Sequence, residues 1–544
     1  MERFIATETL IIELLLIVSL VAIAVRRLRV PYTVALVIAG LLITFGERIE
    51  INLTPELILS LFVPPLVFEA AFHLEYERLR KNLIPIVTLA TPGVLLTTLL
   101  VGWIVAKGAG LSLASGLVFG ALIAATDPVA VVALFRQLGA PKDLTVLVEG
   151  ESLFNDGTAI VVFRLMLAAA LPALPVAATT TNVASDAAPL PSFDLLSGVV
   201  QFVRVAAISV LVGVALGWLA SQIIARVDDY LIETTITTVL AFGAYLIAER
   251  FHVSGVLAVV AAGIVCGNTG LKGMSPTTRI VLFSFWEYLA FVANSLVFLL
   301  IGLDVNIRQL AAAAAPIAIA ILAVLTSRAL VIYGLTWLTN LWRRNESYVS
   351  GAYRHVLFWG GLRGAISLAL ILSLPATFRD REILRVMTFG VVLFTLLAQG
   401  TTMQVLLRRL GLTARAEKEL EYERRQGQLL AARAARERLA QLHADGSISQ
   451  TAWETIAPRF EAELARHQAA QQELLRAEPS LRDAELEDAR REALRTERAT
   501  LVRLHSDGII SEPVYEELVA EVDRRIQHTR ESDKAMRRNG DKAR

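Results

Sequence analysis

Apolar segments of membrane-spanning length follow one another from residue 8 to about residue 410, separated by short charged loops. A helix needs about 20 apolar residues to cross the hydrocarbon core of a membrane. The mean hydropathy of +0.56 and the hydrophobic content of 55% agree with this pattern and lie outside the range of ordinary soluble domains. The sequence therefore predicts an all-α polytopic membrane protein.

Windows of membrane-spanning length predict about 13 transmembrane helices. The first apolar run, residues 10–25, is followed by arginines and a second apolar run without a small-residue cleavage site, so we expect it to be retained. The predicted spans are residues 9–25, 31–46, 54–74, 83–106, 113–135, 144–171, 196–224, 231–249, 253–271, 280–303, 310–340, 350–374 and 384–407.

The basic residues of the loops predict which ends of the spans face the cytoplasm. Loops with clusters such as Arg26/Arg27/Arg29 alternate with loops that carry mostly single basic residues. The positive-inside rule makes the basic set cytoplasmic, which puts the N-terminus outside and the C-terminal tail inside. The Ala- and Arg-rich composition without an organelle signal favours the inner membrane of a bacterium.

A change of composition divides the chain into two domains. Residues 1–411 form the predicted transmembrane domain, and residues 412–544, which we call the tail, are rich in Glu, Arg, Ala, Leu and Gln with apolar residues at helical spacing. The tail is predicted to be a cytosolic helical domain. Within the first domain, residues 172–194 are rich in Ala, Thr, Pro and Ser and predict an unstructured external connector.

The tail contains a weak internal repeat, in which residues 439–449 return as residues 501–511. Each copy contains a Leu-His pair, an Asp-Gly pair and a serine. The glycines suit helix C-termini and the serines suit helix N-caps, so the repeat predicts two hairpin-like pairs of helices. The residues concerned are Gly446, Ser449, Gly508 and Ser511.

Polar groups stand at the centres of two apolar segments: Thr126-Asp127-Pro128 in the first, and residues 151–156, Glu-Ser-Leu-Phe-Asn-Asp, in the second. A carboxylate at the centre of a bilayer costs about 2.5 to 3.5 kcal/mol on insertion scales. Acids retained at this cost are usually functional, and the pattern predicts an ion pathway.

The spacing within these segments predicts a cation site. Ser152, Asn155 and Asp156 lie three and four residues apart and share one helix face, where their oxygens suit a hard monovalent cation. Pro128 removes a backbone donor and frees carbonyls beside Asp127, as in the broken helices of secondary transporters. The structural alternatives are a simple kink at Asp127, a buried acid bonded to neighbouring helices at Asp156, and hydroxyls that bond only their own helices.

A second broken helix is predicted at residues 359–367, where three glycines surround Arg363. Arginine cannot lose its charge, so a buried one needs an anion. Glu151 is the first candidate partner and Glu69, which follows a pair of prolines, is the second; the alternative is that Arg363 extends to a membrane interface. Arg328 lies in another apolar span as a packing or pairing residue without an assigned role.

Three motifs together, Ala-Thr-Asp-Pro-Val-Ala-Val at residues 125–131, Gly-Glu-Ser-Leu-Phe-Asn-Asp-Gly at 150–157 and Gly-Gly-Leu-Arg-Gly-Ala at 360–365, resemble the monovalent cation:proton antiporter family 1, the sodium/proton exchangers. The resemblance covers about residues 8–410 and is closest to the bacterial type. It implies thirteen membrane helices with inverted repeats, two crossing discontinuous helices, and a homodimer with a dimerisation part and a transport core.

The resemblance also implies roles for single residues. Asp156 corresponds to the main ion- and proton-binding carboxylate, and Asp127, Ser152 and the backbone at Thr126 complete a site in which Na⁺ contacts Asp127, Ser152 and Asp156. Asn155 stands where electrogenic relatives have a second aspartate, which implies an electroneutral one-to-one exchange.

The acids outside this set have implied roles as well. Glu151 with Arg363 resembles the buried ion pair of the family, and Glu69 resembles an additional acid near the side from which the ion enters.

The function predicted from all of these features is a secondary antiporter that exchanges Na⁺ for H⁺. A K⁺/H⁺ antiporter of the same fold and a cation channel are the alternatives, and selectivity among Na⁺, K⁺ and Li⁺ is left open. An enzyme is poorly supported, since neither a Walker A motif nor a His-Glu-x-x-His motif occurs. We expect no cofactor besides the transported ions, no nucleic-acid partner, and leave open an unknown cytosolic partner of the tail.

Overall fold

The computed structural model describes residues 2–28, 32–46, 58–171, 195–227, 229–304, 307–342, 349–412, 414–522 and 524–525. The regular elements in these ranges are all helices, which confirms the predicted fold class. The chain divides into two compact units, Met1–Leu412 and Thr413–Arg544. The predicted connector at residues 172–194 lies outside the described residues.

Each predicted span overlaps one or more helices of the first unit. Among the described residues, eight helices are long and apolar enough to cross a membrane, and four more are apolar but shorter. In chain order the elements are α1 Glu2–Leu28, α2 Tyr32–Gly46, η1 Ile58–Phe62, α4 Val63–His73, α5 Tyr76–Ala90, α6 Pro92–Gly108, α7 Leu113–Ala124, α8 Val129–Leu138, α9 Lys142–Ala170, α10 Leu195–Ile224, α11 Tyr230–Arg250, α12 Gly255–Thr269, η2 Gly270–Lys272, α13 Pro276–Asp304, α14 Ile307–Ala312, α15 Ala314–Trp342, α16 Gly351–Trp359, α17 Ala365–Leu372, α18 Arg381–Phe394, η3 Thr395–Gly400 and α19 Thr401–Arg409.

The contacts between these helices divide them into two bundles. In the core bundle, α6 packs along α7, α9 lies between α5 and α7, and α15 packs against α5, α6 and α18. In the flanking bundle, α12 packs against α10, α11 and α4, and α13 packs against α2. The contacts between the bundles are sparser and run from α9 to α4, α10 and α12, from α17 to η1 and α13, and from η3 to α2. The core bundle consists of α5 to α9 and α14 to α19 with η3, and the flanking bundle of α1, α2, η1, α4 and α10 to α13.

Two helix pairs of the core bundle are broken where the sequence predicts it. The helix that starts at α7 is interrupted by four residues without helical structure, 125–128, before α8, and α16 is separated from α17 by residues 360–364. A third irregularity, the π-helical turn η3 between α18 and α19, has no counterpart in the sequence predictions.

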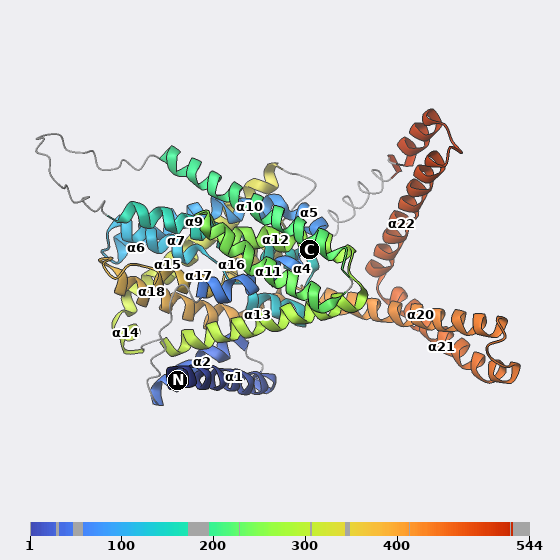
Figure 1. Cartoon of the computed structure of the whole chain (residues 1–544), viewed down its shortest axis with the longest axis horizontal. Coiled ribbons are helices and arrows are strands. Elements are labelled where there is room, and N and C mark those ends of the chain that lie inside the picture. The colour runs from blue at the N-terminus through green and yellow to red at the C-terminus, as the bar shows by residue number, and fades with distance from the viewer. Residues whose placement is uncertain are drawn as a thin grey trace, which may run out of the picture. The chain divides into compact units, whose positions relative to one another are not determined.

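The second unit contains α20 Ala414–Ala444, α21 Gln450–Ala477, α22 Pro479–Ser506 and a short helix at residues 512–522. Helices α20 and α21 run antiparallel as a hairpin (Figure 1). Gly446 and Gly508 have φ angles of 72° and 69°, the left-handed conformation expected after a helix C-terminus. The Ser449 hydroxyl accepts a hydrogen bond from the Ala452 N–H at 3.3 Å, as expected of an N-cap.

Candidate functional site

The two broken helices of the core bundle meet at their breaks. The backbone N–H of Asp127 donates to the carbonyl of Leu362 at 2.8 Å. The Arg363 guanidinium donates through Nη1 to the carbonyls of Ala124 and Ala125, at 2.7 and 3.0 Å. The irregular segment of each pair therefore satisfies polar groups of the other, as expected of two crossing discontinuous helices.

The Asp127 side chain is fixed at this crossing. Its Oδ1 accepts the backbone N–H of Val129 at 3.0 Å and so caps the first turn of α8. Gly364 packs directly against the same carboxylate, where a Cβ atom would collide with it. The glycine after Arg363 is thus required by the close approach of the two chains.

Helix α9 binds the irregular segment around Asp127 through Thr126. The Ser152 hydroxyl donates to the Thr126 carbonyl. Asn155 makes two further bonds, since its Oδ1 accepts from the Thr126 N–H at 3.2 Å and its Nδ2 donates to Thr126 Oγ1 at 2.6 Å. Thr126, Ser152 and Asn155 are buried, and Ser152 and Asn155 lie on one face of α9, as their spacing predicted.

The Asp156 carboxylate lies one helical turn beyond Ser152 and is the least constrained acid of the site. It is within electrostatic reach of Asp127, Glu151 and Arg363. Within the described part of the chain it makes no hydrogen bond or ion pair. Carboxylate and hydroxyl oxygens of Asp127, Ser152 and Asp156 could together hold a hard cation, although their ion-binding role stays a prediction at this point.

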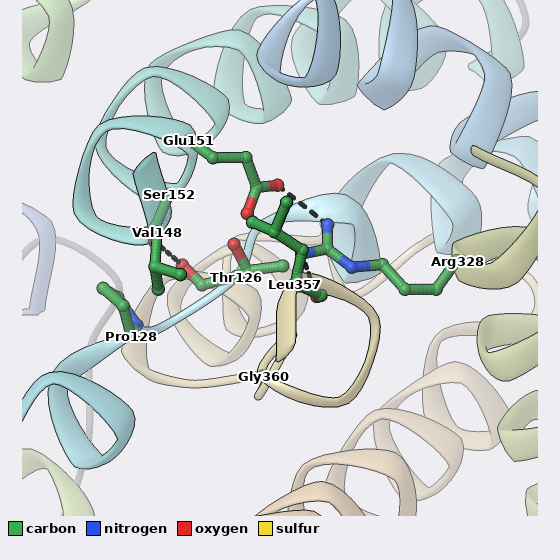
Figure 2. A pocket seen from close by; sticks show the side chains of 8 residues that line it. All are labelled: Thr126, Pro128, Val148, Glu151, Ser152, Arg328, Leu357 and Gly360. Carbon is green, nitrogen blue, oxygen red and sulfur yellow. Dashed lines mark hydrogen bonds and ion pairs between the residues drawn. The ribbon is translucent and has the colours of Figure 1, made fainter. Parts of the chain in front are cut away.

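The partner of Glu151 is Arg328 of α15 (Figure 2), and the predicted direct pair of Glu151 with Arg363 is wrong. Glu151 Oε1 and Oε2 accept from Arg328 Nη1 and Nη2 at 2.8 and 2.9 Å. Arg328 Nη2 also donates to the Leu357 carbonyl at 2.9 Å, and Asn155 Nδ2 donates to Glu151 Oε1 at 3.0 Å. Within the described residues the Arg363 guanidinium bonds the free carbonyls at the C-terminal end of α7, which carry partial negative charge, and no carboxylate.

Arg328 is the main residue of this region whose role the sequence did not predict. The sequence feature that could have indicated its role is that it is a second arginine within an apolar span. A buried arginine needs an anionic partner, and Glu151 was available as one. Gly361 provides space for it, since a Cβ atom there would lie 2.8 Å from Arg328 Nε. Two glycines of the second break therefore serve two different neighbours, the Arg328 guanidinium and the Asp127 carboxylate.

A narrow hollow opens between the two breaks and α9 (Figure 2). The Glu151–Arg328 pair forms one wall, and the Ser152–Thr126 bond lies beside it. Its lining residues come from both broken helices and α9, with Arg328 from α15: Thr126, Pro128, Val148, Glu151, Ser152, Arg328, Leu357 and Gly360.

Glu69 is placed away from Arg363, so its prediction as the second partner of that arginine is also wrong. It lies on α4 of the flanking bundle, where its Oε1 is 3.4 Å from His73 Nδ1 and 3.9 Å from Arg136 Nη2. Arg136 Nη2 is also 3.6 Å from Oε1 of Glu149, an acid that the sequence analysis did not single out. This group of charges lies across the boundary between the bundles, since Arg136 and Glu149 belong to α8 and α9.

Comparison with known proteins agrees with the motifs and the fold. The profile of the family described as sodium/hydrogen exchanger, transmembrane, matches residues 14–409. The Na(+)/H(+) antiporter ApNhaP of Aphanothece halophytica is 40% identical over 501 residues, which cover 90% of this chain and 92% of the relative. The Na(+)/H(+) antiporter NhaG of Bacillus atrophaeus is 33% identical over 503 residues, with 90% and 92% coverage.

A solved structure has the same fold. The sodium proton antiporter MjNhaP1 from Methanocaldococcus jannaschii, determined at pH 8, superposes with a TM-score of 0.59 at 21% sequence identity. The match covers 75% of this chain and 99% of that chain.

Proposed function

This chain belongs to the sodium/hydrogen exchanger family, and we propose that it exchanges a monovalent cation, foremost Na⁺, for H⁺ at a single site around Asp156. The observation that carries this proposal is the Asp156 carboxylate, which is held among charged groups at the crossing of two broken helices without a hydrogen-bond partner in the described residues. Every other acid at the crossing is bonded. Asp156 is therefore the group available to a proton or a cation in turn.

The charge of the site supports a one-to-one exchange. Asp127, Glu151 and Asp156 contribute three carboxylates, and Arg328 and Arg363 contribute two guanidinium groups. When all five are ionised, one net negative charge remains, which a single Na⁺ or a single H⁺ neutralises. Asn155 adds no charge, and the exchange is then electroneutral.

Competition for this charge couples the two fluxes. A proton on Asp156 removes the charge that attracts a cation, and a bound cation favours loss of that proton, so the two exclude each other. Moving an empty, charged site through the membrane is costly, and only the two neutral forms cross. The Ser152 hydroxyl, which donates to the Thr126 carbonyl in this structure, can turn its oxygen toward a cation.

The division into bundles suggests how the site changes sides. The core bundle carries the site and its contacts with the flanking bundle are sparse, so we infer that the core bundle moves against the flanking bundle. The flanking bundle is then the dimerisation part of a homodimer. The protein acts in the cell membrane, with the N-terminus outside and the tail in the cytoplasm.

Proton flux in proteoliposomes with an imposed pH gradient tests the proposal. Addition of Na⁺ should dissipate the gradient, equally with free and valinomycin-clamped voltage. The Asp156→Asn variant should lose exchange completely, whereas Asp143→Asn, which changes a half-exposed acid at the start of the same helix, should keep it. Exchange at the normal rate in Asp156→Asn contradicts the site, dissipation by K⁺ alone favours a K⁺/H⁺ antiporter, and current without proton movement favours a channel.

A further inference from the structure

The π-helical turn η3 lies beside the second broken helix. Turns of this kind are rare, and they occur frequently at functional sites. Its first residue, Thr395, is buried, with an exposed fraction of 1%. The Thr395 hydroxyl donates to the Val392 carbonyl at 3.0 Å and accepts from the backbone N–H of Arg363 at 3.2 Å. One side chain of η3 thus contacts the break directly.

The bond to Arg363 satisfies a backbone group that the break leaves free. Arg363 lies between α16 and α17, where its N–H has no carbonyl of its own helix to bond. A buried N–H needs a partner, and Thr395 supplies it across 32 positions of sequence. The helix before the break, α16, is bonded to α19, which directly follows η3, because Trp359 Nε1 donates to Thr402 Oγ1 at 2.8 Å.

Arg363 connects Thr395 to the segment around Asp127. Its side chain bonds the carbonyls of Ala124 and Ala125, just before Thr126. The carbonyl of the preceding residue, Leu362, accepts the N–H of Asp127. A shift of the backbone at Arg363 would therefore move both contacts that hold the segment around Asp127.

We propose that Thr395 is a positioning residue of the transport site, which fixes the broken segment at Arg363 against Asp127 and thereby sets the affinity for the cation. The proposal rests on the proposed function, because it assumes that the cation binds at this crossing. Thr395 itself need not touch the ion. It fixes the position of residues 360–364 relative to residues 125–128.

A set of threonine variants tests this role in the full-length protein. Thr395→Val keeps the shape but removes both hydrogen bonds, and Thr395→Ser keeps the hydroxyl. Thr388→Val is the matched control, since Thr388 is equally buried on α18 but donates to the Leu384 carbonyl of its own helix at 2.7 Å. We expect Thr395→Val to raise the KM for Na⁺ about three- to tenfold, as for a lost hydrogen bond, with a smaller change in kcat.

Thr395→Ser and Thr388→Val should both keep a KM within about twofold of the wild type, which is less than one hydrogen bond is worth. An unchanged KM in Thr395→Val, or an equal rise in Thr388→Val, would overturn the proposal. Thr395→Ala, which also removes both bonds, replaces Thr395→Val if that variant does not fold. Thermal unfolding at increasing Na⁺ concentration measures binding without transport, so the comparison of variants stands even if the wild type fails to exchange protons.

Discussion

Two of the ion pairs of helix α9 lie in different surroundings, and comparing them distinguishes contacts that hold the site in place from contacts that change when it moves. The inner pair, Glu151 with Arg328, lies within the core bundle, and its side chains are 3% and 9% exposed. The outer pair, Arg164 with Glu249, joins α9 to α11 of the flanking bundle, and its side chains are 46% and 30% exposed.

The two pairs also differ in how completely they are bonded. Both oxygens of Glu151 bind separate nitrogens of Arg328, the Leu357 carbonyl accepts a further bond from Arg328, and Asn155 donates one to Glu151. In the outer pair a single nitrogen, Arg164 Nη2, contacts both oxygens of Glu249 at 3.0 Å. We therefore expect the inner pair to persist through the proposed transport cycle, whereas the outer pair crosses the boundary along which the bundles are proposed to slide.

Breaking the inner pair should have the largest effect. Glu151→Gln or Arg328→Gln leaves one buried charge without its partner, which costs about 3 to 5 kcal/mol of stability. We expect a strongly lowered Tm in thermal unfolding and loss of exchange in proteoliposomes. Single variants as stable as the wild type would show that the pair is not desolvated in the membrane.

A double variant provides the control for this prediction. In Glu151→Leu with Arg328→Met both charges leave together, and replacement of a buried pair by apolar side chains is often neutral for stability. The double variant should therefore be more stable than either single variant. The site then keeps two carboxylates against the guanidinium of Arg363, the same single net negative charge as in the wild type, so the double variant should regain part of the exchange that the single variants lose.

Arg363 sharpens the comparison, because it is a buried arginine bonded to carbonyls and not to a carboxylate. Arg363→Gln removes hydrogen bonds from a charged donor, which are worth about 1.5 to 3 kcal/mol. We expect a smaller loss of Tm than for the inner pair, together with strongly reduced exchange. Arg363→Lys keeps the charge without the planar fork and should fall between Arg363→Gln and the wild type; equal loss in both would assign the effect to geometry alone.

The sequence predicted those parts of the site that depend on local spacing. The break at Thr126-Asp127-Pro128 follows from the missing N–H of proline, and the shared face of Ser152 and Asn155 follows from the helical repeat. Both are present in the structure. The second break was equally local, because three glycines surround Arg363.

The sequence did not predict which distant groups pair. Glu151 and Arg328 are 177 positions apart, and their contact depends on how α15 lies against α9, which no local pattern encodes. The rule that a buried arginine needs an anion selected a carboxylate for Arg363, although carbonyls at a helix end serve as well. The contact of Thr395 with the second break was not predicted for the same reason, since its partner Arg363 is 32 positions away.

The outer pair should give the smallest change in stability and the most informative change in rate. An exposed ion pair contributes about 0.2 to 1 kcal/mol, so Arg164→Gln should leave Tm almost unchanged. If the pair must break when the core bundle moves, its removal lowers that barrier, and kcat should rise by up to about fivefold for 1 kcal/mol. The charge-reversed double variant, Arg164→Glu with Glu249→Arg, should restore the wild-type kcat. An unchanged kcat in Arg164→Gln would mean that the pair stays intact throughout transport, and the boundary of the moving body would then have to include α11.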